Sequence, residues 1–170
     1  MPDDSEYEAS PVEDAELHQE PEEANRISFF VSGDPIPKGS MKSYYVKSMK
    51  RVVTTNANPN TSTWQQRIAY EAQRANESRR VVFYSCDSNC GYEVETEFRF
   101  ARPKSLPKKH KLNTKRPDLD KLIRTVLDGL ASQIIYDDSQ VVSVKASKRY
   151  VVEGETPGVL ITVNRVFDHR

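Results

Sequence analysis

The sequence of residues 116–130 is RPDLDKLIRTVLDGL, and it predicts a helix that begins with two acidic side chains. Its apolar residues recur at intervals of three and four, the spacing that places side chains on one face of an α-helix. They are Leu119, Leu122, Ile123, Val126, Leu127 and Leu130. We therefore expect an amphipathic helix from about Asp118 to Leu130 that packs against a sheet, with Asp118 and Asp120 at its start.

Strands are expected both before and after this helix in the sequence. Alternation indicates strands at residues 27–31, 92–100 and 142–144, and a final strand is expected at 159–166 after turn residues. Residues 43–55 are rich in tyrosine and valine and are expected to be extended. The glutamates of 92–100 then fall on one solvated face and are not expected to be catalytic. A second helix is expected from Thr63 to about Asn76, because Trp64, Ile68 and Ala72 follow at four-residue spacing.

Charge divides the 170-residue chain into two unequal parts. Residues 1–26 hold ten acids and one base, which gives −9, and the remainder holds 24 bases and 15 acids, which gives +9. The first part is too polar to offset the entropy of ordering, so we expect a disordered acidic tail. The rest, residues 27–170, is expected to form one domain that favours a polyanion such as nucleic acid.

The acidic tail suggests two further hypotheses. It can fold back on the basic domain and compete with DNA, or it can recruit a basic partner. It lacks the apolar run of a secretory signal, and no stretch is apolar enough to span a membrane, so we expect a soluble, cytoplasmic protein. Cys86 and Cys90 are too few for a structural zinc site and are expected to be reduced.

Two acidic groupings are candidates for chemistry, Asp118 with Asp120 and Asp137 with Asp138. Each alone has a simple structural explanation, because aspartate often caps a helix or makes a turn. Together they can form one cluster if the helix returns the chain beside its start. Clustered carboxylates need a cation, and hard oxygen ligands suit Mg²⁺ or Mn²⁺.

Basic residues surround these carboxylates. Residues 101–116 hold seven bases and no acid, and two prolines there favour a loop. Such a loop beside a carboxylate cluster suits a phosphodiester substrate. Arg124, one turn after Asp120, is either a catalytic cation or a surface partner of Asp120 or Asp128, and we expect Asp128 to be structural. The candidate DNA contacts are Lys38, Lys42, Lys104, Lys108, Lys109, Lys111, Lys115, Arg116, Lys121, Lys145 and Lys148.

Three segments of the chain resemble the RusA-like Holliday junction resolvases. They are residues 116–122 (RPDLDKL), 127–130 (LDGL) and 135–141 (IYDDSQV), with Lys145 and Lys148 after them. Residues 33–39 (GDPIPKG) also resemble the opening loop of that family. The similarity extends from about Ile27 to Val166.

The resemblance implies an α+β fold in which a small mixed β-sheet packs with two main α-helices, as an intertwined homodimer. It also implies a Mg²⁺-dependent endonuclease, with Mn²⁺ as a substitute, that nicks four-way junctions symmetrically in DNA recombination and repair. Forks and flaps are further candidate substrates. By motif match, Asp118, Asp120 and Asp138 are the metal ligands and catalytic residues. A bacterial or phage origin is expected on the same ground.

Two residues depart from the family pattern. The family usually has asparagine directly after the second aspartate and lysine four residues after it, where this chain has Lys121 and Arg124. Arg124 keeps the charge and can bind phosphate in a bidentate way. Lys121 either weakens metal binding or contacts phosphate. The alternative from another functional class is a nonenzymatic protein that binds branched or single-stranded DNA and has a degenerate metal site.

Overall fold

The computed structural model describes residues 22–56, 58–78, 83, 89–107 and 109–167. Most of the predicted acidic tail therefore lies outside the described residues, as does Cys86. Glu22–Asn25, at the end of the expected tail, form a 3-10 helix, η1, and the first strand begins at Arg26. The side chain of Asn25 accepts a hydrogen bond of 2.9 Å from Arg165, which attaches this segment to the sheet.

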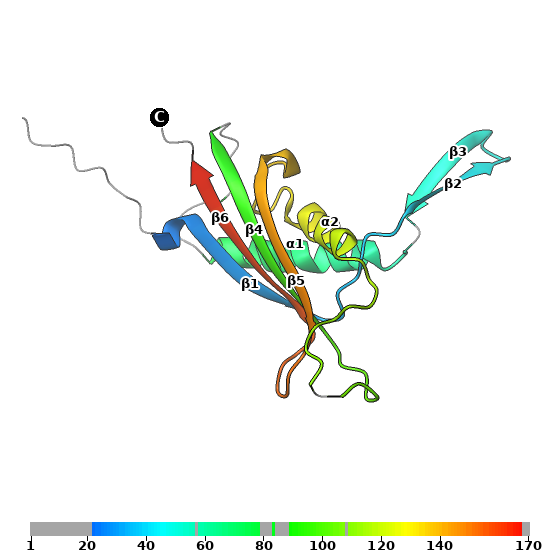
Figure 1. Cartoon of the computed structure of the whole chain (residues 1–170). Helices are drawn as coiled ribbons and strands as arrows, with labels where there is room; N and C mark the ends of the chain where they lie inside the picture. Colours follow the sequence, from blue (N-terminus) through cyan, green and yellow to red (C-terminus); the bar gives the residue numbers. More distant parts are fainter. Residues whose placement is uncertain (1–21, 57, 79–82, 84–88, 108, 168–170) are drawn as a thin grey trace, which may run out of the picture.

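A four-stranded mixed sheet forms the centre of the molecule (Figure 1). Its order is β1 (Arg26–Ser32), β6 (Gly158–Phe167), β4 (Cys90–Phe100) and β5 (Val141–Tyr150). Only β4 and β5 are parallel, and the other neighbours are antiparallel. The predicted strands are confirmed, with β5 longer than the short run at 142–144. Phe83, the one described residue between residues 78 and 89, is buried.

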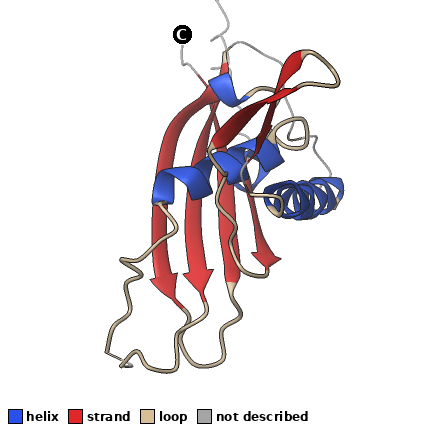
Figure 2. Cartoon of the chain, turned by 90° about the vertical axis from the view of Figure 1, so that its right-hand side faces the viewer, coloured by secondary structure: helices blue, strands red, loops and turns tan. Residues whose placement is uncertain are grey.

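Two helices cover one face of this sheet, as predicted (Figure 2). Helix α1 spans Thr61–Glu77 and helix α2 spans Leu119–Leu130. Helix α1 starts two residues before Thr63, because Asn60 is its N-cap and the Thr61 hydroxyl donates to the carbonyl of Pro37 at 3.1 Å. None of the described helices is long and apolar enough to cross a membrane.

The apolar faces of both helices and of the sheet form one buried core. It includes Trp64, Ile68, Tyr92, Phe98, Leu122, Val126, Leu130, Ile134 and Ile161. Helix α2 packs tightly against α1 at Gly129, where an added Cβ would lie 2.8 Å from Cγ2 of Ile68 and 3.2 Å from the carbonyl of Gln65. A side chain as small as a methyl group would thus push the helices apart.

Residues 43–55, expected to be extended, form a separate hairpin. Strand β2 (Met41–Val46) pairs antiparallel with β3 (Arg51–Asn56), and the four residues between them make the turn. Lys50 has a positive φ of 47° there. The hairpin points away from the sheet and helices (Figures 1 and 2).

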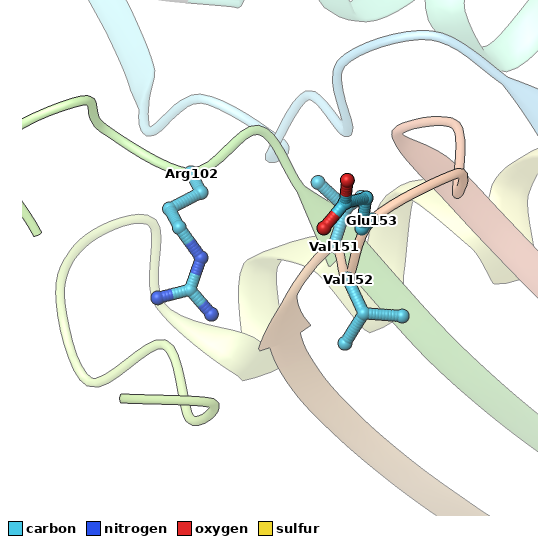
Figure 3. Close-up of a pocket in the computed structure, with 4 residues that line it drawn as sticks. All are labelled: Arg102, Val151, Val152 and Glu153. Atoms are coloured by element: carbon cyan, nitrogen blue, oxygen red, sulfur yellow. The ribbon is translucent and has the colours of Figure 1, made fainter. Parts of the chain in front are cut away.

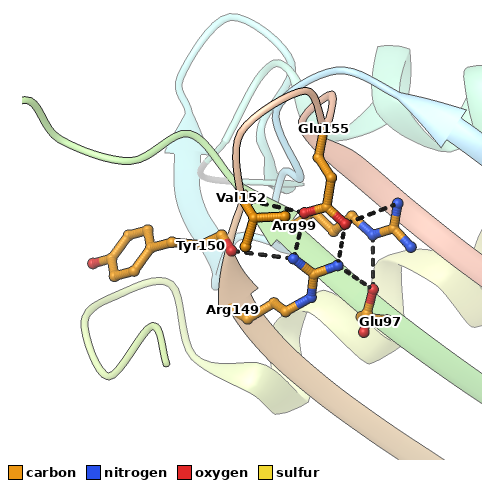
Figure 4. A network of polar contacts seen from close by, with 6 residues as sticks. All are labelled: Glu97, Arg99, Arg149, Tyr150, Val152 and Glu155. Carbon is orange, nitrogen blue, oxygen red and sulfur yellow. Dashed lines mark hydrogen bonds and ion pairs between the residues drawn. The ribbon is translucent and has the colours of Figure 1, made fainter. Parts of the chain in front are cut away.

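Charged side chains at the ends of β4 and β5 form a network of hydrogen bonds and ion pairs on the outer face of the sheet (Figure 4). Arg149 donates to Glu97 at 3.0 Å and to Glu155 at 2.7 Å, and Glu155 also accepts from the backbone N–H of Val152 at 2.9 Å. These bonds lower the pKa of Glu155 to about 2, and Arg149 lowers the pKa of Glu97. Glu97 of β4 thus belongs to this network, and Glu93 and Glu95 are exposed on the same face, as expected.

Replacing Gly129 by alanine tests the close approach of the helices. We expect Gly129→Ala to lower the free energy of unfolding by about 1–3 kcal/mol, the usual cost of an overpacked contact, although alanine favours helix. Chemical denaturation measures this, with Gln66→Ala on the exposed side of α1 as the control. A Gly129→Ala protein as stable as the wild type would contradict the tight packing.

The charged network predicts a pH-dependent stability. A carboxyl whose pKa is lowered in the folded state stabilises the protein above its unfolded pKa of about 4.3, and this is lost as pH falls towards its folded pKa. We therefore expect Glu155→Gln to be less stable than the wild type at pH 6, with the difference shrinking between pH 4 and pH 2. Urea denaturation at several pH values measures both. A difference that does not change with pH would show that Glu155 contributes through packing instead.

Candidate functional site

Asp118 precedes α2 but does not cap it with its side chain. It is the N-cap residue, yet its carboxylate accepts no capping hydrogen bond, so the simple structural interpretation is wrong for this residue. The carboxylate is 55% exposed and lies 3.4 Å from the amine of Lys121. Asp120 is exposed in the first turn of the same helix. Both carboxylates are therefore accessible to a ligand.

Lys148 on β5 holds the segment that leads into Asp118. Its amine donates to the carbonyl of Lys115 at 2.7 Å and to that of Pro117 at 2.8 Å. The end of the basic loop also pairs with the edge of β5, through an isolated bridge between Leu112 and Arg149. Lys148 was predicted as a DNA contact, but its amine is engaged by the backbone. Its position indicates that it orients the start of α2.

A pocket of about 510 Å³ opens beside Asp118. It is lined by Pro35, Ile36, Pro37, Asn58, Asn60, Arg116, Pro117, Asp118 and Lys121. The opening loop reaches it through a hydrogen bond of 3.0 Å from the backbone N–H of Lys38 to the carbonyl of Lys121. The pocket thus combines a carboxylate, two cations and two side-chain amides. Asn58 and Asn60 were not predicted, because nothing in their local sequence places them near residue 118.

Asp128 stabilises the contact between the opening loop and the helices. Its carboxylate lies 2.7 Å from the amine of Lys38 and accepts a 2.7 Å hydrogen bond from Gln65. The structural interpretation of Asp128 is therefore confirmed. Lys38, a candidate DNA contact, is engaged by this ion pair and lies at the side of α2 instead of reaching freely into solvent.

Asp137 and Asp138, the second acidic grouping, have different roles. Asp137 is the N-cap of η2 (Asp138–Gln140), and its carboxylate accepts from the backbone N–H of Ser139 at 2.8 Å. Hydrogen bonds from Ser139 lower the pKa of Asp137. Asp138, the first residue of η2, is exposed. The capping interpretation therefore holds for Asp137 and leaves Asp138 as the candidate ligand.

The three predicted metal ligands do not gather in one chain. In the part of the chain that is described, no three His, Cys, Asp or Glu side chains lie close enough together to hold a metal ion. Asp118 follows Pro117, which Lys148 contacts, whereas Asp138 precedes the first residue of β5, Val141. Lys148 lies seven residues after Val141 in the same strand, so these two residues are roughly 23 Å apart. The expectation that α2 returns Asp138 to Asp118 is therefore not met.

The other predicted cations lie in several places. Lys104, Lys109, Lys111, Lys115 and Arg116 are exposed on the basic loop, Lys42 lies on β2, and Lys108 is outside the described residues. Lys145 pairs with Glu95 at 2.8 Å on the outer face of the sheet, where alternation separates it from Lys148. Arg124 is exposed and makes no ion pair with Asp120 or Asp128, two residues that are also described.

A second hollow lies near the turn after β5 and has no relation to the carboxylates. It has a volume of about 380 Å³ and is lined by Arg102, Val151, Val152 and Glu153 (Figure 3). None of the predicted site residues lines it. The pocket beside Asp118 combines a predicted metal ligand with two predicted cations, Arg116 and Lys121, and is therefore the candidate site.

Comparison with known families gives one match. The family model described as Endodeoxyribonuclease RusA matches residues 33–164. This range contains Asp118, Asp120 and Asp138 together with the pocket. No curated protein matches the chain. Because the match covers most of the 170 residues, the chain belongs to the RusA family of endodeoxyribonucleases, which resolve Holliday junctions.

Proposed function

We propose that this protein is a Mg²⁺-dependent endodeoxyribonuclease that nicks branched DNA at the start of α2. The observation that carries the proposal is the accessible pair Asp118 and Asp120, beside a pocket that also contains Arg116 and Lys121. Mg²⁺ is often bound through one or two protein carboxylates together with substrate phosphate, so this pair fits the ion. Mn²⁺ has the same ligand preference and is expected to substitute.

The ion, when bound, would polarise the scissile phosphate and lower the pKa of a bound water. The protein supplies positive potential around the phosphate. Arg116 and Lys121 bind the phosphodiester on either side of Asp118, and the N-terminus of α2 adds positive potential there. Lys121 also pairs with Asp118, so it neutralises that carboxylate until the ion and DNA arrive. Arg124, one turn beyond Asp120, supplies a further cation for the phosphate.

A symmetric homodimer explains how Asp138 can take part. One chain keeps Asp138 far from Asp118, and a second copy of the chain would bring its own Asp138 to complete the ligand set. Exposed apolar side chains flank Asp138 in the sequence, namely Tyr136, Val142 and Val144. Such residues favour burial against a partner. A dimer with two such sites would nick the two strands of a junction symmetrically.

The roles of Asp118 and of the ion are tested by one substitution. We expect Asp118→Asn to abolish nicking of a labelled four-way junction while binding is kept, because the change removes a ligand charge but preserves shape. Wild-type protein in EDTA should behave in the same way. Gel assays measure both activities, with Glu153→Gln, away from the pocket, as the matched control. An unchanged nicking rate for Asp118→Asn would remove the proposed metal role.

The same assay decides between the enzyme and the alternative of a DNA-binding protein with a degenerate site. The lack of three gathered ligands within the described residues of one chain favours that alternative. Wild-type protein that binds the junction but does not nick it with Mg²⁺ or Mn²⁺ would establish it.

A further inference from the structure

The β2–β3 hairpin exposes large apolar side chains. Tyr44 is 53% exposed, Tyr45 59%, Met49 59% and Val52 63%. The hairpin extends away from the sheet and helices (Figure 1), in keeping with the exposure of these side chains. A two-stranded hairpin alone is only marginally stable in water, and the exposed cross-strand pair Tyr45 and Val52 marks a candidate binding surface.

The register of the hairpin places one tyrosine on each of its faces. Tyr45 is opposite Val52, and Tyr44 is opposite Val53, on the other face. The hydroxyls of Ser43 and Thr54 are 2.8 Å apart, which joins the two strands beside the Tyr45 pair. The two aromatic rings therefore lie on opposite faces of a hydrogen-bonded ribbon, so each ring can contact a different segment of a ligand.

The charge of the hairpin favours a polyanion. Residues 41–56 contain four bases and no acid. Lys47, Lys50 and Arg51 lie at the turn, are exposed, and form no ion pair with any residue that the structure describes. Cations that have no protein partner are available to bind phosphate.

The base of the hairpin lies at the candidate nuclease site. The chain enters β2 after Pro35, Ile36 and Pro37 and leaves β3 before Asn58 and Asn60, and all five residues line the pocket beside Asp118. DNA held at Asp118 therefore passes next to the hairpin. The hairpin of a second copy is a poorer occupant, because two hairpins of the same charge would repel each other.

We propose that the hairpin grips branched DNA beside the cleavage site, with its turn cations on phosphates and with Tyr44 and Tyr45 stacked on bases unpaired at the branch. The proposal rests on the proposed function and deepens it. Stacking on an aromatic ring suits any base, but it requires bases that are not paired within a duplex. The tyrosines would thus distinguish a branch from linear DNA, whereas the cations would bind both.

Two sets of variants of the full chain test this division of roles. We expect Tyr44→Ser with Tyr45→Ser to weaken binding to a four-way junction by about tenfold or more and to leave linear duplex binding nearly unchanged. Tyr44→Phe with Tyr45→Phe keeps the rings and should bind as the wild type does. Replacing Lys47, Lys50 and Arg51 by glutamine should weaken both DNAs and reduce the salt dependence. Arg74→Gln, on α1, is the charge control.

Binding is measured in EDTA, with 2-aminopurine at the branch point to report stacking, and the mass of each variant in solution is measured in parallel. Serine variants that bind the junction as tightly as the wild type would overturn the proposal. So would serine variants that change from dimer to monomer, because the hairpin would then be an interface between copies. Wild-type protein that binds no junction would overturn the proposed function as well, so the two failures are distinguishable.

Discussion

Helix α2 acts as a rigid spacer, and the arrangement of the candidate site depends on it. Its tight contact with α1 at Gly129 and its buried apolar face fix it on the sheet. Asp118 precedes this twelve-residue helix, which is about 18 Å long, and Asp138 follows it at the end of β5 opposite to Lys148, so the two carboxylates lie apart within one chain. This constraint accounts for the absence of a three-ligand site among the described residues and for the dimer proposed above.

Three sets of contacts fix the start of α2. Lys148 binds the carbonyls before Asp118, the backbone of Lys38 binds the carbonyl of Lys121, and Asp128 pairs with the amine of Lys38. Lys148 and Lys38 therefore serve the architecture of the site, which leaves Arg116, Lys121 and the exposed lysines of the loop as the candidate phosphate contacts. A pocket positioned in this way can orient a phosphodiester before any metal binds.

Local patterns predicted the elements of the fold well, because a buried face imposes a period on the chain. This applies to α2, to β4 and to the solvated glutamates beside its buried residues. The site was predicted less completely, since long-range placement has no local signal. Capping geometry separated Asp137 from Asp138, while the distance between Asp118 and Asp138 and the roles of Asn58 and Asn60 depend on packing between distant segments. The hairpin turn was missed because no glycine marks it.

Mixing two inactive variants tests most directly whether Asp118 and Asp138 act together across a dimer. Asp118→Asn and Asp138→Asn are each expected to be inactive. If one site uses Asp118 of one copy and Asp138 of the other, mixed dimers contain one intact site, and random mixing restores about a quarter of the wild-type sites. Single nicks in the junction at that level are the predicted result. A mixture as inactive as its two components, with exchange of copies verified by mass, would contradict the shared site.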